Sequence, residues 1–415
     1  MTCEEPVSTH RSADLHSAVV VGRCVKKLVS IPLNLCLGLF LADAAISVLD
    51  STLVLLLGLH LLTPVRMMLS FLTVAAAAAI YVLMAITPMI PKRFFLPLAL
   101  FNPVALLALL PCMIYHYAWR PQLDWVFSFG QLVLGLAVLF LIQGGFKLRW
   151  PFLSEDKFGD RPFGWLNLSG FVAVNLFVLL PGVMLYLALC ASLAVEHFSA
   201  SFLVMHRGGL TVSARKYVRA DGKTIQLIPM MHIGEASFYD RVAKSFPTNS
   251  IVLLEGVTDE KRLLKHDLTY KRAATTLGLT EQHEEFAPTQ GELRRADVDI
   301  GEFSEGTIDL LNLATLLHSR GFSVPVLLEL FQKSQNPLLA EKLEEDLLIK
   351  RNQHLLEEIK TALEDSENVI VPWGAAHMPG IAREIQKTGF VLDESREYAV
   401  VNFRSLLQRS RPKAK

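Results

Sequence analysis

The sequence predicts an N-terminal α-helical membrane bundle followed by a single α/β domain with a mostly parallel central sheet. Hydrophobic residues make up 52% of the 415 residues, and the mean hydropathy of +0.37 is high for a soluble protein. The apolar excess is confined to residues 28–195, where charges are scarce, whereas the chain after Glu196 has the composition of an ordinary soluble domain. In this second part strand-like runs alternate with helical ones, which is typical of an α/β sheet.

Five segments are candidates to cross a membrane, because about 20 apolar residues are needed to span the hydrocarbon core. Four meet this length easily: about Val65–Thr87, Phe94–His116, Asp124–Gln143 and Trp165–Val195. The other, Ile31–Leu62, contains Asp43 and Asp50, seven residues apart on one helical face. We expect it to span, and a helix lying in the interface is the alternative. The predicted divisions are a polar segment 1–27, a transmembrane region 28–196, an α/β domain 197–405 and a basic tail 406–415.

The loop charges predict the orientation of these spans. With the N-terminus inside, the inner loops hold Arg11, Arg23, Lys26, Lys27, Lys92, Arg93, Lys147, Arg149, Lys157 and Arg161. The outer loops hold only Arg66 and Arg120, which is the expected positive-inside bias. Five crossings then place the α/β domain outside the cytoplasm, whereas four would leave it in the cytoplasm. Because few other polar residues interrupt the spans, we interpret the bundle as an anchor in the lipid bilayer rather than a transporter.

The elements of the α/β domain follow from local patterns. The residues Asp221-Gly222 form a hairpin turn signal, and the run Thr224–Met230 after it is strand-like. Helical periodicity covers Glu235–Phe246, and a continuously apolar strand follows, "SIVLL", ending at Glu255. A long helix is predicted from Asn336 as N-cap, with Pro337 at its first position. Closing strands are predicted in "GFVLDESREYAVVNF".

Two passages place a histidine where a strand ends and a helix begins. "QLIPMMHIGEASFYD" contains His232 and "VIVPWGAAHMPGIAREI" contains His377, while Glu255 ends a third apolar run. Since the carboxyl ends of parallel strands meet at one edge of a sheet, we expect these three side chains to converge there. Two imidazoles and a carboxylate are the ligand set of an open catalytic metal site. The alternative is that each histidine is structural. The zero net charge, with 40 basic and 40 acidic residues, gives no indication of a nucleic-acid partner.

With these residues in place, the domain resembles the TraB/GumN/PrgY family, in a superfamily with the Tiki metalloproteases, the ChaN haem-iron proteins and the erythromycin esterases. "GAAHMPGI" matches the second GxxH motif of the family at Gly374 and His377. "LLEG" matches its glutamate at Glu255, and "KRNQHLLEEI" is similar to its Arg-Asn helix. The acidic segment "ADVDIGEFS" is also similar, at Asp297 and Asp299. The first motif departs from the family, because "PMMH" has Pro229 where the family has glycine.

The resemblance implies a metal-dependent hydrolase acting on peptides at a membrane surface. The implied metal, Mn, Zn or Co, would be held by His232, His377 and Glu255. It would lower the pKa of a bound water, with Glu255 as ligand or general base and Arg351 stabilising the oxyanion. The resemblance also implies substrate contacts from Asn352, Asp299 and Gly374. The expected substrate is a peptide or a small molecule. The alternative is a non-catalytic, membrane-tethered protein that binds or sequesters a peptide, of the pheromone-shutdown type.

Overall fold

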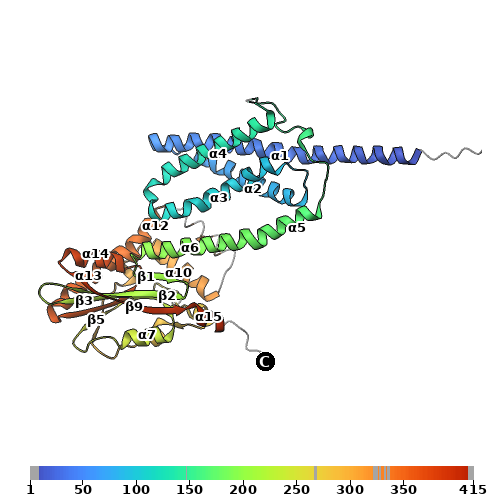
Figure 1. Cartoon of the computed structure of the whole chain (residues 1–415). Coiled ribbons are helices and arrows are strands. Elements are labelled where there is room, and N and C mark those ends of the chain that lie inside the picture. The colour runs from blue at the N-terminus through green and yellow to red at the C-terminus, as the bar shows by residue number, and fades with distance from the viewer. Residues whose placement is uncertain are drawn as a thin grey trace, which may run out of the picture. The chain divides into compact units, whose positions relative to one another are not determined.

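The computed structural model describes residues 9–145, 147–265, 269–320 and 337–409, together with residues 326, 329, 330 and 333 (Figure 1). The chain forms two compact units that divide between Cys190 and Ala191, close to the boundary predicted at residue 196. An N-terminal helical unit precedes a unit built on a sheet, so the predicted fold class is confirmed. The predicted N-cap Asn336 and residues 410–415 of the predicted basic tail lie outside the described residues.

Long apolar helices make up the first unit. They are α1 (Thr9–Leu57), α2 (Thr63–Ile86), α3 (Lys92–Tyr115), α4 (Arg120–Gln143), α5 (Trp165–Val174) and α6 (Leu180–Phe198). A π-helical segment, Asn175–Leu179, joins α5 to α6. The helix α1 begins at Thr9, so the described part of the predicted N-terminal segment continues the first apolar helix rather than standing apart from it.

Five stretches of the described residues are long and apolar enough to cross a membrane. They are Lys26–Leu57, Thr63–Ile86, Lys92–Tyr115, Tyr117–Gln143 and Trp165–Phe198. The first of them contains Asp43 and Asp50, so the two acidic residues do not shorten this stretch below a spanning length. Both side chains are buried, at 2% and 1% exposure. The polar side of this helix therefore faces the inside of the bundle.

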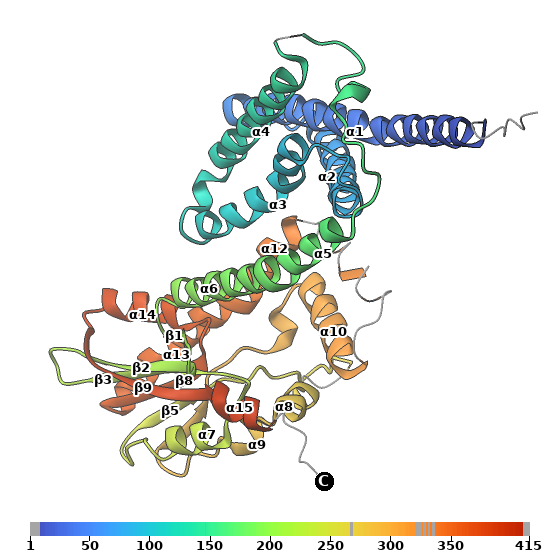
Figure 2. The same ribbon diagram turned by 45° about the vertical axis from the view of Figure 1, so that its right-hand side comes forward.

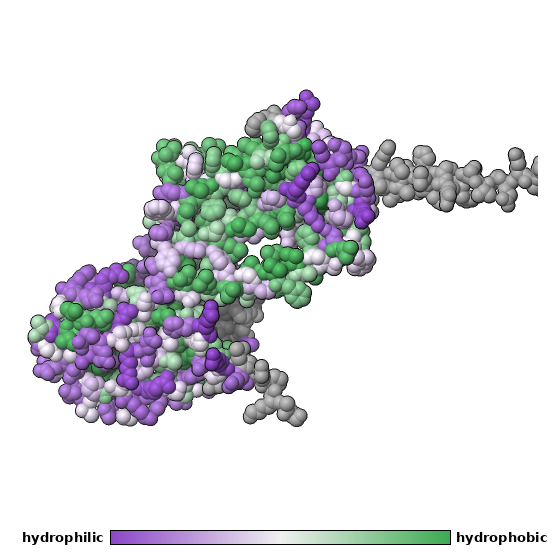
Figure 3. Space-filling model, in the orientation of Figure 1, coloured by the Kyte–Doolittle hydropathy of each residue, from purple (hydrophilic) through white to green (hydrophobic). Residues whose placement is uncertain are grey.

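The helical unit has an apolar core and an apolar outer surface. Its core is formed by residues of α1 to α4, such as Leu37, Phe40, Ile80, Phe95 and Val138. Large hydrophobic side chains remain exposed along the same helices, and Figure 3 shows them over much of the visible face of this unit. Such a surface is unfavourable in water and favourable in hydrocarbon, which supports membrane association.

The second unit is built on one seven-stranded sheet. Its strands are β1 (Leu203–His206), β2 (Gly209–Val218), β3 (Thr224–Met230), β5 (Ile251–Leu254), β7 (Glu292–Arg295), β8 (Asn368–Gly374) and β9 (Val391–Asn402). The strands β3, β8, β5 and β7 pair in parallel, in that order. The strand β2 pairs antiparallel with β3, β1 and β9. The predicted hairpin joins β2 to β3, and Gly222 in its turn has a φ of 84°.

Helices cover both faces of this sheet (Figures 1 and 2). One face packs on α13 (Arg351–Asp365) and α14 (Met378–Lys387), through Leu355, Ile359 and Ile381 among others. The other face packs on α7 (Ala236–Ala243), through Phe238 and Val242. Further helices are α8 (Lys271–Leu277), α9 (Gln282–Glu285), α10 (Glu305–Arg320), α12 (Pro337–Glu344) and α15 (Phe403–Arg409), and a small second sheet pairs β4 (Ile233–Gly234) with β6 (Thr280–Glu281).

The predicted long helix is continuous from Pro337 to Asp365 but contains a π-helical segment, Glu345–Lys350, between α12 and α13. Within this segment Asp346 is buried and accepts hydrogen bonds from the Ser304 and Thr307 hydroxyls, each at 2.7 Å. Arg351 follows the segment directly, as the first residue of α13. One helix thus contacts α10 through Asp346 and presents Arg351 one residue after the π segment.

Pro229 occupies a position of β3 that tolerates proline. It lies opposite Trp373 of the parallel neighbour β8, while β2 pairs only with residues 224–227 on the other side of β3. A proline has no amide proton to donate, and here the strand has passed the end of its pairing with β2. The departure from glycine in the first family motif therefore fits the sheet.

Candidate functional site

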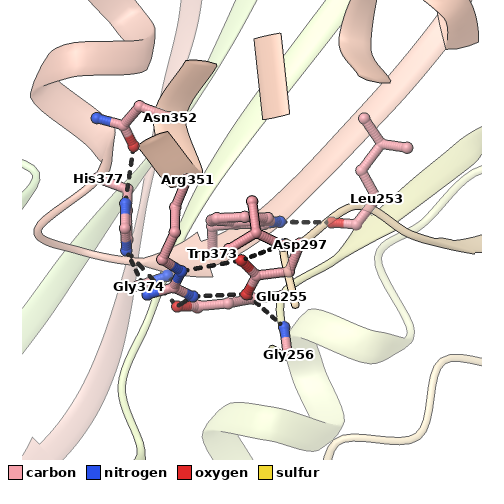
Figure 4. A network of polar contacts seen from close by, with 10 residues as sticks. Leu253, Glu255, Gly256, Asp297, Arg351, Asn352, Trp373, Gly374 and His377 are labelled. Carbon is pink, nitrogen blue, oxygen red and sulfur yellow. Dashed lines mark hydrogen bonds and ion pairs between the residues drawn. The ribbon is translucent and has the colours of Figure 1, made fainter. Parts of the chain in front are cut away.

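Polar side chains meet at the carboxyl edge of the parallel strands, as shown in Figure 4. Glu255 follows β5 directly, Asp297 comes two residues after β7, and His377 comes three residues after β8. Arg351, at the start of α13, completes the group from the helix layer. The convergence at one strand edge agrees with the rule for ligand sites in open α/β sheets. We call these four side chains the Arg351 cluster.

The guanidinium of Arg351 is the centre of this cluster. It donates from Nε and Nη2 to the two oxygens of Asp297, at 2.9 and 2.6 Å. A further bond runs from Nη2 to Glu255 Oε1 at 2.8 Å. The side chains are 13% exposed for Arg351, 11% for Glu255 and 0% for Asp297. Burial alone would lower the pKa of Arg351, but the two carboxylates outweigh it and raise the pKa. The cation is therefore held permanently charged between them.

The GxxH motif positions both Glu255 and His377. The Gly374 amide donates to Glu255 Oε2 at 2.6 Å, and a Cβ on Gly374 would lie 3.3 Å from that oxygen. A side chain here would crowd the carboxylate, so glycine permits the close approach. The His377 amide donates to the Gly374 carbonyl at 3.0 Å, and this turn carries the imidazole to the start of α14. Gly374 thus contributes its backbone to the site.

The imidazole of His377 is neutral near pH 7. Burial, followed by the positive charge of Arg351 and a smaller effect of His232, lowers its pKa to about 4, against the opposing effects of Glu255 and Asp297. Its Nδ1 lies 2.7 Å from Asn352 Oδ1 and its Nε2 lies 3.1 Å from Arg351 Nη1. Since a carbonyl oxygen only accepts and a guanidinium only donates, we assign the proton to Nδ1. The Nε2 lone pair then accepts from Arg351.

A buried tryptophan, Trp373, packs against Arg351 and His377 of the cluster, and it was not among the predicted site residues. Trp373 is fully buried, and its Nε1 donates to the Leu253 carbonyl at 3.0 Å. The Arg351 guanidinium lies 5.3 Å from the centre of its ring, and the His377 ring packs edge-on at 5.3 Å. The indole therefore ties β8 to β5 and gives Arg351 and His377 a rigid apolar base. In the sequence, Trp373 directly precedes Gly374 of the GxxH motif "GAAH", and this position is the signal that could have identified it as a residue of the site.

His232, the remaining member of the predicted metal triad, lies near enough to His377 to contribute to the lowering of its pKa but is not hydrogen-bonded into this network. Its side chain is exposed, and its ring stacks on Tyr270 with the centroids 4.9 Å apart. Among the described residues it makes no hydrogen bond or ion pair with Glu255 or His377. Burial raises the pKa of Tyr270, and the charge of Glu255 adds to the effect, so Tyr270 lies near enough to the cluster to feel its charge. His232 and Tyr270 form a flat aromatic surface.

Of the two acidic residues in "ADVDIGEFS", Asp297 rather than Asp299 faces the cluster. Asp297 also accepts from the Gly256 amide at 2.9 Å. Asp299, the predicted substrate contact, accepts from the Glu260 and Gly301 amides at 3.1 and 2.8 Å and from the Thr258 hydroxyl at 2.8 Å. These bonds lower the pKa of Asp299, the Glu260 amide foremost. Asp299 therefore caps a short helical turn, Ile300–Glu302, with its oxygens occupied.

The arranged side chains do not fit the metal that the family resemblance implies. The His377 Nε2 lone pair and one Glu255 oxygen are directed at Arg351, and the other Glu255 oxygen accepts from Gly374. A metal ion bound by these atoms would have to displace the guanidinium. Within the described part of the chain, one group of His, Cys, Asp and Glu brings at least three ligand atoms within 4.8 Å of one another: Glu281, His283 and Glu284. There Glu281 is already engaged by Thr269 and the Tyr270 amide.

We expect His377 to make the α/β domain less stable as the pH falls from about 6.5 to about 4. In this interval the unfolded chain takes up a proton at His377 and the folded domain does not, which favours unfolding. Above pH 6.5 neither state carries the proton, so the full stability is present. The lowering from 6.5 to about 4 corresponds to a loss of about 3 kcal/mol at the acid end.

Urea unfolding of residues 199–415 between pH 4 and 7 measures this loss through the fluorescence of Trp373, the single tryptophan of that segment. The variant His377→Gln has no titrating group at this position. Its free energy of unfolding should fall less than that of the wild type over the same interval. Equal losses in both proteins would show that other groups account for the acid sensitivity.

The chain was also compared with known proteins. No family model, no curated protein and no solved structure matches it. The resemblance to the TraB/GumN/PrgY group therefore stays a prediction that rests on the motifs at Glu255, Arg351, Gly374 and His377.

Proposed function

We propose that the α/β domain is a membrane-tethered binding module for a peptide or small molecule that carries a cationic group. The observation that carries this proposal is the charge balance of the Arg351 cluster. Two carboxylates, Glu255 and Asp297, surround one guanidinium, and the lowered pKa keeps His377 neutral. The cluster therefore has a net charge of −1 at neutral pH. An amino group, such as the amino terminus of a peptide, complements this charge.

The position of the cluster supports the same proposal. Glu255 is partly exposed, at 11%, so a ligand can reach its carboxylate. The stacked rings of His232 and Tyr270 offer an apolar surface for the rest of the ligand. Ligand sites commonly combine such a surface with a few fixed polar groups. From the loop-charge bias we further propose that the module lies outside the cytoplasm.

The second candidate is the metal-dependent peptide hydrolase, with the roles that the resemblance implies for His232, Glu255 and His377. It is favoured by one distance: His377 Nε2 lies only 3.7 Å from Glu255 Oε1, on the edge where His232 also ends its strand. Since Arg351 occupies both atoms, this candidate requires the guanidinium to move away when a metal binds. Metal content and turnover distinguish the two candidates.

The test uses full-length protein in detergent micelles. Short synthetic peptides with free or acetylated amino termini are titrated by calorimetry, and the metal content is measured by elemental analysis before and after incubation with Mn, Zn or Co. We expect peptides with free amino termini to bind more tightly than acetylated ones and to remain uncleaved. Glu255→Gln should weaken their binding by roughly tenfold or more, since it removes a charged partner. Glu285→Gln, an exposed position of α9, is the matched control.

Two results would decide against the binding module. One is equal affinity for free and acetylated peptides in the wild type. The other is stoichiometric metal that is lost in His377→Ala and supports peptide cleavage, which would establish the hydrolase instead. The fold is common to both functions, so only these measurements separate them.

A further inference from the structure

A cavity of about 690 Å³ opens in the helical unit where α1 ends and where α2 and α4 begin. Its polar lining includes Asp50, His60, Arg66, Ser70, Arg120 and Asp124. Cavities of this size hold small molecules or several waters. In a membrane bundle, charged side chains of this kind line paths for ions or substrates more often than they serve an anchor.

The charge of Asp50 is already compensated. Its carboxylate is 1% exposed and lies 3.5 Å from the Arg66 guanidinium. It also accepts from the Thr63 hydroxyl at 3.1 Å. Arg66 in turn donates to the Ser51 hydroxyl at 3.1 Å. This pair forms one wall of the cavity and leaves no unbalanced charge there.

The charge of Asp43, two helical turns before Asp50 in α1, is not compensated in the same way by a neighbouring cation in the part of the chain that the structure describes. The Asp43 carboxylate is 2% exposed and is contacted by three neutral groups. The Ser70 hydroxyl of α2 donates to Oδ1 at 2.6 Å, and the Gln131 amide of α4 donates to Oδ2 at 2.8 Å. The Ser47 hydroxyl lies 3.5 Å from Oδ1. Among the described residues, no lysine, arginine or histidine pairs with Asp43.

A buried carboxylate without a cation is expensive in an apolar surrounding. Ser70 connects this carboxylate to the cavity, because it both lines the cavity and contacts Asp43. Asp43 itself does not line the cavity, so the Ser70 hydroxyl is the group that lies between the cavity and this carboxylate. The groups around the carboxylate also supply further oxygens, since a half-turn of the Gln131 amide exchanges its nitrogen for its oxygen.

We propose that Asp43 binds a sodium ion that enters through this cavity. Its ligands are the Asp43 carboxylate, the hydroxyl oxygens of Ser47 and Ser70, and the amide oxygen of Gln131. An all-oxygen set selects a hard cation. One carboxylate balances the single positive charge of a sodium ion, whereas a divalent ion in a protein is usually bound by more than one carboxylate. The bound ion neutralises the buried charge and links α1, α2 and α4.

The experiment follows the thermal unfolding of full-length protein in detergent micelles at pH 7.5. NaCl is compared with choline chloride at equal ionic strength, so that screening is the same in both. We expect Tm to rise with NaCl in a saturable way, by roughly 3–8 °C, because an ion that binds only the folded state stabilises it. Asp43→Asn should abolish the rise. Asp156→Asn, which changes an exposed carboxylate of the segment Glu155–Lys157 outside the cavity lining, should retain it.

If Asp43→Asn does not fold, Ser70→Ala replaces it. This variant removes one neutral ligand and should shift the NaCl concentration at half-saturation upward by several-fold. The proposal is overturned if NaCl and choline chloride give the same Tm in the wild type, or if Asp43→Asn or Ser70→Ala responds to NaCl as the wild type does. A Tm that rises on acidification without any response to NaCl would also overturn it, by showing that a proton neutralises Asp43.

Discussion

Arg351→Ala is expected to lower the free energy of unfolding of the α/β domain by about 3–5 kcal/mol. The substitution leaves the Asp297 carboxylate, which is fully buried, and the Glu255 carboxylate without their shared cation. Breaking a buried ion pair costs this much because an uncompensated charge stays in a medium of low polarity. Urea unfolding of residues 199–415, followed by the fluorescence of Trp373, gives the value.

Arg294→Ala is the matched control for this prediction. Arg294 also bridges two carboxylates, Glu292 at 2.7 Å and Asp365 at 2.8 Å, but these are 62% and 55% exposed. Water replaces an exposed ion pair at little cost, so this variant should unfold close to the wild type. Similar losses in both variants would mean that the burial of the Arg351 cluster adds nothing to the stability of the domain.

Trp373→Ala should destabilise the domain by about 3–5 kcal/mol as well, but for a different reason. The indole is the largest of the fully buried side chains, and its removal leaves a cavity beneath the cluster. The Leu253 carbonyl also loses its hydrogen bond. Since this variant lacks the fluorescent reporter, circular dichroism follows its unfolding in urea.

The companion variant Trp373→Phe separates the two contributions. It keeps most of the apolar volume and loses the indole N–H, so its cost should be closer to the 1–3 kcal/mol of an unsatisfied buried acceptor. If both variants unfold at the urea concentration of the wild type, the indole is not part of the cooperative core. His377 should also become more exposed in Trp373→Ala, because the edge-on contact with its ring is lost.

Much of the fold could be predicted because its elements have strong local signals. The apolar runs that became β3, β5 and β8 are short and rich in β-branched residues, which favours strands over buried helices, and the Asp221-Gly222 turn predicts the hairpin between β2 and β3. The five candidate membrane-spanning stretches could be predicted from length and hydropathy alone. The start of α1 at Thr9 was missed because hydropathy marks where apolar residues begin, whereas a helix continues through polar ones.

The site was predicted in part. Sequence position brings Glu255, Gly374 and His377 to one edge because the strands that carry them are parallel. Sequence position does not determine which hydrogen-bond or ion-pair partner each of these side chains has. Arg351 was expected to face a substrate and instead contacts Asp297, Glu255 and His377. Asp297 and Asp299 are two residues apart, and only the path of the chain after β7 decides which of them turns inward.

The π-helical segment before Arg351 has a consequence for comparing this chain with others. A π turn is equivalent to one extra residue in an α-helix, and one residue corresponds to a rotation of about 100°. A related protein with a regular helix here would therefore have one residue fewer between the counterparts of Asp346 and Arg351. A sequence motif of fixed spacing that extends across Glu345–Lys350 would therefore miss such a protein. Two separate motifs, one before and one after this segment, would find it if the alignment allows a gap of one residue between them.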